Sequence, residues 1–285
     1  MMIGFAGLGR MGRPMATNLA RAGYTVLAYD PGTPKTMPEG VTAVDSAAEL
    51  AKAPLTISML PDGATTRALL VEEILPGTAV DHLHVVMGTV GPELLREMVD
   101  LGVVEVIDAP VSGSVSMAET AMITTMVGGT AEQFERIRPV LAAMTSAQFH
   151  TGPTGTGSVT KLAVNAVLAA LSQGVAEGLL IAEAGDLDSK VFYAVLRTSA
   201  AGAPYVGYKE QAFLSPETAG VAAPVSLIRK DLGLALDLAH RRKLDLPGAQ
   251  AAYMVLGDAI EAGLGEADMA QVLAALLLRN ALAPS

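Results

Sequence analysis

Short apolar runs alternate with helix-like stretches over the first 150 residues of the chain. Each run is rich in β-branched or other apolar residues and is bounded by Gly, Pro or Asp, which predicts a buried strand. The predicted strands span residues 2–6, 24–29, 55–60, 84–87, 103–107 and 121–127. Strands that alternate with helices are typical of an α/β fold, here a Rossmann-type doubly wound parallel sheet.

The pattern changes after residue 153, where the composition becomes rich in alanine and leucine and helical to the end of the chain. Breaks are expected near Gly185, Gly202, Pro247 and Gly263 and across residues 216–224. A first helix over 156–184 would be about 40 Å long, enough to leave one domain and support the next. We therefore expect an α/β domain over 1–153 and an all-helical domain over 154–285.

A glycine-rich turn follows the first predicted strand directly. It has the GxGxxG spacing of a dinucleotide-binding turn, in which the glycines allow a tight turn, a close approach to the pyrophosphate and close helix packing. A helix over 13–22 and the second strand follow, which is the context that the motif requires. The residues expected to contact the cofactor here are Gly7, Leu8, Gly9, Arg10, Met11 and Gly12.

Asp30 closes the second predicted strand, 18 residues after Gly12. An acid about 20 residues on accepts hydrogen bonds from the adenosine ribose and repels a 2′-phosphate, which favours NAD over NADP. Lys35 is the only nearby cation and leaves NADP open. The prolines at 31, 34 and 38 predict a short, irregular connection in place of a crossover helix.

Composition excludes several kinds of chemistry. The chain has no cysteine, hence no disulfide, thiolate catalysis or cysteine-bound zinc, and its four histidines lack helical metal-ligand spacing, so no metal is expected. A net charge of −10 without a basic tract argues against nucleic acid. The most apolar stretch, residues 162–184, carries Asn165, Gln173, Glu177 and Glu183, which favours a buried helix over a membrane span. We expect a cytoplasmic protein.

Lys161 and Asn165 are four residues apart on the long predicted helix and therefore share a face. Residues 108–113 follow a predicted strand at its carboxyl end, where parallel sheets bind ligands. A serine hydroxyl and successive backbone N–H groups in such a turn can hold a carboxylate.

Together these residues resemble the β-hydroxyacid dehydrogenase family, which contains 3-hydroxyisobutyrate dehydrogenase and tartronate semialdehyde reductase. The resemblance rests on five ordered motifs at residues 4–24, 58–61, 108–114, 152–165 and 230–236. It implies reversible hydride transfer between NAD(H) and a β-hydroxyacid or semialdehyde, and a C-terminal domain like that of 6-phosphogluconate dehydrogenase.

The resemblance also implies a role for individual residues. Lys161 would be the general acid/base and Asn165 its substrate-orienting partner, while Ser112, Gly113 and Ser114 would hold a substrate carboxylate. The cofactor would be lined by Leu60, Pro61, Thr65, Thr89 and Lys230.

Three positions depart from the usual pattern of the family. Gly88 replaces a serine, Ser114 replaces a glycine, and Ala223 stands where many relatives carry phenylalanine. Loss of that ring suggests a larger or different substrate pocket.

Two other functions are weighed against the dehydrogenase. Imine reductases share the architecture, but that branch lacks the lysine present here as Lys161. A non-catalytic NAD-binding redox sensor would not need Lys161 and Asn165. Apolar residues on most sides of a helix over 268–283 predict burial against a second copy, so a homodimer or homotetramer is expected.

Overall fold

The structure is a computed structural model that describes residues 1–32, 36–79, 81–102 and 105–281. The chain divides into two compact units, Met1–Lys161 and Leu162–Ser285.

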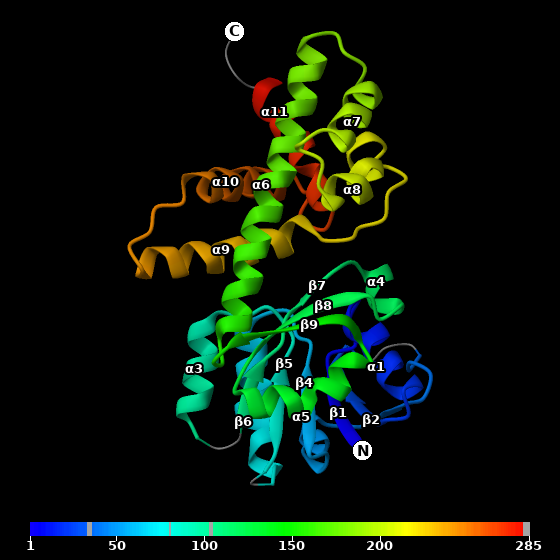
Figure 1. Ribbon diagram of the computed structural model, residues 1–285, viewed down its shortest axis with the longest axis vertical. Coiled ribbons are helices and arrows are strands. Elements are labelled where there is room, and N and C mark those ends of the chain that lie inside the picture. Colours follow the sequence, from blue (N-terminus) through cyan, green and yellow to red (C-terminus); the bar gives the residue numbers. More distant parts are fainter. Residues whose placement is uncertain (33–35, 80, 103–104, 282–285) are drawn as a thin grey trace. The chain divides into compact units, whose positions relative to one another are not determined.

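In the part of the chain that the structure describes, the first unit is built on a nine-stranded sheet (Figure 1). The strands are β1 (Met2–Ala6), β2 (Thr25–Tyr29), β3 (Val41–Ala43), β4 (Leu55–Ser58), β5 (Leu83–Val86), β6 (Glu105–Asp108), β7 (Val111–Ser112), β8 (Ile123–Gly128) and β9 (Thr145–Gly152). Their order is β3-β2-β1-β4-β5-β6-β8-β7, with β9 paired to β8.

The six predicted strands are present, although Val103 and Val104 lie outside the described residues. Pairing is parallel from β3 through β6 and between β8 and β9, whereas β8 runs antiparallel to β6 and β7. The parallel, doubly wound fold is therefore confirmed, with one reversed section. Three strands were not predicted, because β3 and β7 are only three and two residues long and β9 is a largely polar strand without an apolar run.

Helices cover both faces of this sheet. They are α1 (Gly12–Arg21), η1 (Ala47–Lys52), α2 (Gly63–Ala68), η2 (Leu69–Ile74), η3 (Leu75–Gly77), α3 (Pro92–Asp100), α4 (Val115–Glu119) and α5 (Ala131–Ala142). No helix joins β2 to β3 in the described residues of that connection, as the prolines predict.

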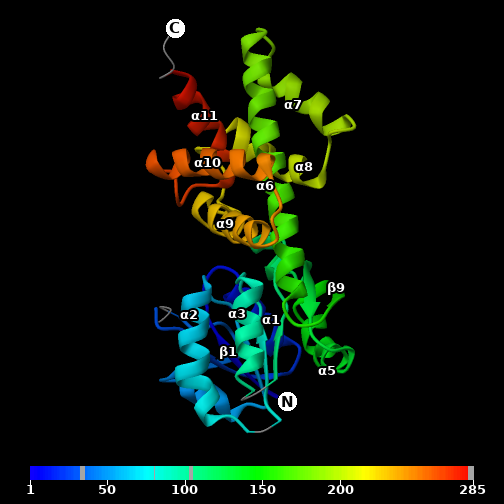
Figure 2. The ribbon, with the colours of Figure 1, turned by 90° about the vertical axis from the view of Figure 1, so that its left-hand side faces the viewer.

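Two hydrophobic cores lie on the two faces, since successive strand residues point to opposite sides. Phe5 of β1 belongs to a core with residues of α1 and α5, whereas its neighbour Ala6 belongs to a core with η1, η2 and α3. Figure 2 shows α2 and α3 on one side of this unit and α5 next to β9 on the other.

The second unit is all-helical where described, as predicted. After α6 (Thr156–Ala184) come α7 (Ser189–Thr198), α8 (Pro204–Leu214), α9 (Val225–Arg241), α10 (Pro247–Glu261), η4 (Met269–Gln271) and α11 (Val272–Ala281). All the predicted breaks fall at helix ends or connections, and Pro247 occupies the first turn of α10, where its missing N–H is not needed. The helix predicted over 268–283 begins as η4 and continues as α11, and its last two residues lie outside the described part.

Helix α6 is long and apolar enough to cross a membrane by length and composition alone. Its residues Leu162, Ala169, Val175, Ala176 and Leu179 belong to the core of the second unit. One face of α6 therefore packs in this core, and about one third of its apolar window is buried.

A buried polar network links β4 and β5 inside the first unit. The Thr56 hydroxyl lies 2.8 Å from His82 Nε2 and 2.6 Å from His84 Nδ1, and the Ser58 hydroxyl lies 2.9 Å from His84 Nε2. Both histidines are thus satisfied core residues. Burial lowers the pKa of His84 to about 3, and burial also lowers the pKa of His82.

This network predicts a loss of stability in acid. In the unfolded chain each imidazole binds a proton below about pH 6.5, whereas in the folded chain His84 stays neutral down to about pH 3. The contribution of the neutral histidines to the free energy of unfolding is therefore fully present above pH 6.5. It declines as the pH falls, by about 1.4 kcal/mol per pH unit for each such histidine. We expect His84→Asn to reduce this slope by about that amount.

The opening free energy of the β4 and β5 amides, measured by hydrogen exchange between pH 6.5 and 5, checks this prediction. His240→Asn is the control, because the His240 side chain is exposed. Equal slopes in wild type and His84→Asn would contradict it.

Candidate active site

The glycines of the first turn are required by close backbone contacts. Gly7 has φ +95°, and a methyl group on it would overlap the carbonyl oxygen of Met59. A methyl group on Gly12 would overlap the carbonyl oxygen of Gly7. Gly9, by contrast, is exposed with no atom near its missing side chain, as a backbone that receives a pyrophosphate must be. These features fit a bound dinucleotide.

Asp30 holds this turn in place from the end of β2. Its carboxylate accepts hydrogen bonds from the backbone N–H of Leu8 at 2.6 Å and of Gly32 at 2.8 Å. The carboxylate therefore lies beside the turn, where it can accept ribose hydroxyls and repel a 2′-phosphate. Lys35, the cation that left NADP open, lies outside the described residues.

The structure brings the other predicted cofactor residues of the first unit to the same edge of the sheet. β4 pairs with both β1 and β5, so Leu60, which follows β4, lies next to the glycine turn at Gly7, and Thr89, which follows β5, lies at the same edge beside the segment after β4. Leu60 is buried, Thr89 is half-buried, and Pro61 and Thr65 are exposed. The N–H of Thr65 donates to Asp62, which caps α2.

Gly88 has a packing role that the sequence did not indicate. A methyl group there would overlap the carbonyl oxygen of Leu60 and lie 3.1 Å from its nitrogen. The Leu60 backbone therefore fills the space that a serine side chain would need. Replacement of serine by Gly88 lets the segment after β4 approach β5 and does not enlarge a pocket.

The predicted carboxylate-binding residues lie at the end of β7. Ser112 is half-buried, Gly113 is exposed with φ +146°, and Ser114 caps α4 by accepting the N–H of Met117 at 3.3 Å. Ser114 thus replaces the usual glycine with a helix-capping residue. Its hydroxyl also lies 2.8 Å from that of Ser116.

Lys161 and Asn165 lie one turn apart on α6, as predicted. The Asn165 side chain is buried, and its Nδ2 donates to Asp231 Oδ2 at 2.6 Å. A carboxylate only accepts hydrogen bonds, so Asp231 fixes the amide with Nδ2 towards itself and Oδ1 away from it. Asn165 Oδ1 is buried without a hydrogen-bond partner in the described structure. It is therefore placed to accept a hydrogen bond from a ligand.

Asp231 is a functional candidate that sequence reasoning missed. It follows Lys230 on α9 and is almost fully buried, and its Oδ1 lies 2.8 Å from Lys230 Nζ. The signal available was an acidic residue inside the motif at 230–236. Its partner Asn165 lies 66 residues away, and no spacing rule indicates that contact.

Ala223 belongs to a segment held by a second buried carboxylate. Asp268 pairs with the buried Lys209 at 2.6 Å and accepts the backbone N–H groups of Ala222 at 2.9 Å and Ala223 at 3.3 Å. The backbone at Ala223 is thus tightly fixed just before α9 begins.

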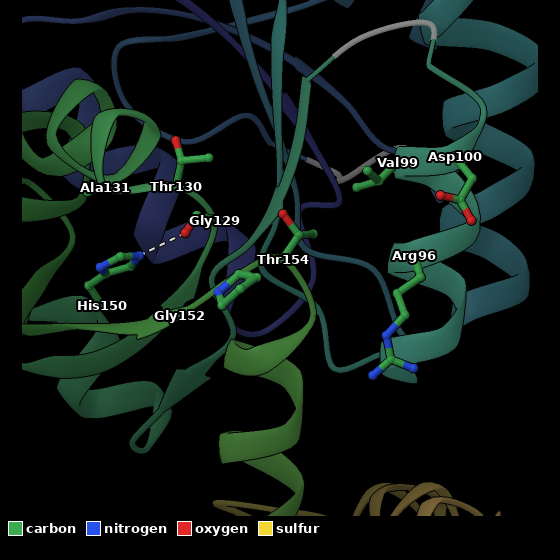
Figure 3. A pocket seen from close by; sticks show the side chains of 10 residues that line it. Arg96, Val99, Asp100, Gly129, Thr130, Ala131, His150, Gly152 and Thr154 are labelled. Carbon is green, nitrogen blue, oxygen red and sulfur yellow. Dashed lines mark hydrogen bonds between the residues drawn. The ribbon is translucent and has the colours of Figure 1, made fainter.

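The first unit also has a pocket of about 540 Å³ that is separate from the predicted site residues (Figure 3). It is lined by residues of α3, β9 and the start of α5, among them Arg96, Asp100 and Thr130. His150 lies at its wall with Nε2 2.7 Å from the carbonyl oxygen of Gly129. None of the predicted substrate or cofactor residues lines this pocket.

Comparison with known proteins decides the family. Residues 2–152 match the family described as the NAD binding domain of 6-phosphogluconate dehydrogenase. Residues 155–276 match the family described as NAD-binding of NADP-dependent 3-hydroxyisobutyrate dehydrogenase. The chain belongs to the β-hydroxyacid dehydrogenase family. It is therefore an oxidoreductase acting on CH–OH groups with NAD as cofactor, as its motifs imply.

Similar proteins span nearly the same length. An NAD-dependent L-serine dehydrogenase of Pseudomonas aeruginosa is 33% identical over 95% of this chain and 96% of its own. A 3-hydroxyisobutyrate dehydrogenase of the same organism is 36% identical over 86% of this chain and 87% of its own. The structure of Mycobacterium tuberculosis 3-hydroxyisobutyrate dehydrogenase with L-serine gives a TM-score of 0.85 at 28% identity. The match covers 96% of this chain and 98% of that chain.

The imine reductase alternative is less favoured. An imine reductase from Pseudomonas sp. covers 96% of this chain and 99% of its own, with a TM-score of 0.61 at 20% identity. That similarity shows a shared fold alone.

The Asn165–Asp231 contact leads to a prediction for this dehydrogenase. An amide at 231 donates as well as accepts, so Asp231→Asn no longer fixes the orientation of Asn165. Loss of a hydrogen bond to a charged group should lower kcat/KM for a β-hydroxyacid substrate by about 10- to 100-fold. Steady-state kinetics measure this, with Asp237→Asn on the exposed side of α9 as control. Equal kcat/KM values for the two variants would rule out the role of Asp231.

Proposed function

We propose that the protein reversibly oxidises a small carboxylated β-hydroxyacid to its semialdehyde, with Lys161 as general acid/base. The observation that carries this proposal is the pair of polar side chains on α6. Asn165 presents a buried acceptor without a partner among the described residues, one turn from the amine of Lys161. Such an acceptor needs an N–H or O–H donor, which a bound substrate or the Lys161 amine can supply.

The proton chemistry follows from these two residues. During oxidation the substrate hydroxyl donates its single hydrogen bond to the neutral amine of Lys161, and Lys161 Nζ takes that proton as the hydride leaves the carbon. Asn165 Oδ1 accepts a hydrogen bond from an N–H of Lys161 or from another donor of the substrate, and so orients the reacting groups. In the reverse direction Lys161 returns the proton and stabilises the negative charge that develops on the oxygen. The bound NAD(H), held by the glycine turn, Asp30 and the segments at Leu60 and Thr89, supplies the hydride acceptor or donor.

Substrate recognition is assigned to the end of β7. The Ser112 hydroxyl and the backbone N–H groups of Gly113 and Ser114 can bind the substrate carboxylate. Ala223 would leave room for a larger substrate than the usual phenylalanine allows. The relatives that act on L-serine and on 3-hydroxyisobutyrate support short β-hydroxyacids as the first compounds to test.

We propose that the enzyme is cytoplasmic and works as a homodimer at least, with no membrane or nucleic-acid partner. The chain contains no cysteine and needs no oxidising compartment. Large apolar side chains are more than 40% exposed on α6, α7 and α11 and just after α6, which supports a second copy as their cover. They are Val167, Ile181, Leu187, Val191, Val195, Leu277 and Leu278.

Sedimentation at micromolar concentration should give a dimer or a larger assembly, and a stable monomer would refute the proposed assembly.

The central prediction concerns Lys161. Without its amine the reaction loses general acid/base catalysis, so Lys161→Ala should lower kcat by about 10²- to 10⁴-fold. The dissociation constant of NADH, measured by fluorescence titration, should change less than about twofold because the turn around Gly7–Gly12 is untouched. Lys190→Ala, an exposed lysine on α7, is the control.

The assay follows NADH at 340 nm with L-serine, 3-hydroxyisobutyrate, a homologue with a larger C2 group and cyclic imines. Turnover of imines alone, unaffected by Lys161→Ala, would support the alternative that the protein is an imine reductase. NADH binding without turnover of any compound would support the non-catalytic sensor.

A further inference from the structure

A buried carboxylate in the first unit joins the sheet to the start of α6. Asp108 is the last residue of β6 and its side chain is fully buried. Its Oδ1 accepts the backbone N–H of Gly155 at 2.6 Å, and its Oδ2 accepts that of Ser158 at 2.5 Å. Both donors belong to the first turn of α6 or to the residue just before it.

The Asp108 carboxylate caps the N-terminus of α6, although it lies on a strand far from α6 in the sequence. The first N–H groups of a helix have no partner inside the helix and are normally capped by the preceding side chain. Gly155, which precedes α6, has no side chain and has φ +96°. Asp108 supplies the missing acceptor from 47 residues away, and its negative charge faces the positive end of the helix dipole.

The packing around Asp108 leaves no freedom in the attachment. A methyl group on Gly128 would overlap Asp108 Oδ1, and one on Gly157 would overlap the carbonyl oxygen of Met126 and lie 2.9 Å from Asp108 Oδ2. The Thr154 hydroxyl adds a hydrogen bond to the carbonyl oxygen of Val106 at 3.2 Å. The start of α6 is therefore attached to β6 at three points.

Two parts of the proposed active site extend from this attachment. Lys161 lies six residues after Gly155, about 9 Å along the helix axis. Ser112, Gly113 and Ser114 lie four to six residues after Asp108 along the chain. If α6 began one residue earlier or later, Lys161 would turn by about 100° around the helix axis.

We propose that Asp108 is a positioning residue for the reaction, which sets Lys161 at a fixed place relative to the carboxylate-binding residues Ser112–Ser114. This inference rests on the proposed function, in which Lys161 moves the proton. Both oxygens of the fully buried Asp108 are bound to backbone N–H groups, so it acts through the start of α6. Burial raises its pKa to about 6 despite two N–H donors, so the fold retains a costly buried acid where an apolar residue would pack more easily.

The test uses Asp108→Asn, which keeps the shape but offers a single oxygen acceptor for two N–H donors. With 3-hydroxyisobutyrate or L-serine we expect kcat to fall by about 10- to 100-fold while the NADH dissociation constant stays within about twofold. The isotope effect on kcat, measured with the same compound deuterated at its carbinol carbon, should rise because hydride transfer becomes slower. A protein that is merely less stable would lose active molecules without a change in isotope effect.

Thr145→Val is the matched control, because it removes another buried hydrogen bond of the first unit, from Thr145 Oγ1 to the carbonyl oxygen of Leu141 at 2.9 Å. It should leave kcat and the isotope effect unchanged. Gly157→Ala is a second variant that displaces the helix start while keeping the charge of Asp108, and it should reproduce the kinetic effect of Asp108→Asn. If Asp108→Asn does not fold, this variant carries the test.

A readout without turnover separates this inference from the proposed function. Lysines are dimethylated with ¹³C-formaldehyde, and the Lys161 signal is assigned by its absence in Lys161→Arg. We expect the ¹³C shift of Lys161 to move in Asp108→Asn and not in Thr145→Val. An unmoved signal, or wild-type kcat and isotope effect in both Asp108→Asn and Gly157→Ala, would overturn the role of Asp108. If wild type oxidises neither compound but the signal moves, the proposed substrate class fails and the positioning role stands.

Discussion

Close approach of backbones at the carboxyl edge of the sheet is the constraint on which this protein depends. Gly7 lies against the Met59 carbonyl, Gly12 against the Gly7 carbonyl and Gly88 against the Leu60 carbonyl. A side chain at any of these positions would push apart the segments after β1, β4 and β5. The edge that receives the dinucleotide is therefore built from backbone, and glycine is the residue that permits it.

Carboxylates, buried except for the half-buried Asp30, hold backbone segments and one side chain of this protein in place. Asp30 holds the first turn through the N–H of Leu8, Asp108 caps α6, and Asp268 fixes the segment before α9. Asp231 instead orients an amide side chain, that of Asn165. In each case an acceptor-only group selects one arrangement of the donors around it, because any other arrangement leaves a buried polar group unsatisfied.

The departures from the family pattern have different physical meanings once packing is considered. Gly88 and Ser114 are local accommodations, since one makes room for the Leu60 backbone and the other caps α4. Ala223 differs, because its backbone is held by Asp268 while its side chain is small and half-buried. Of the three positions, it is the one at which the proposed function expects a larger substrate.

The sequence by itself determined the α/β character of the first unit, the helical second unit, the bounds of α6 and the glycine turn with Asp30. These features depend on periodicity, on glycine spacing and on contacts between residues close along the chain, which can be inferred locally. The antiparallel course of β8, the strand β9, the crowding at Gly88 and the partners of Asp108 and Asn165 were decided only by the tertiary structure. Each depends on atoms brought together from distant segments, 47 residues apart for Asp108 and Gly155 and 66 for Asn165 and Asp231. No local pattern encodes which distant donor meets a buried carboxylate, because that choice is made by the packing of whole elements.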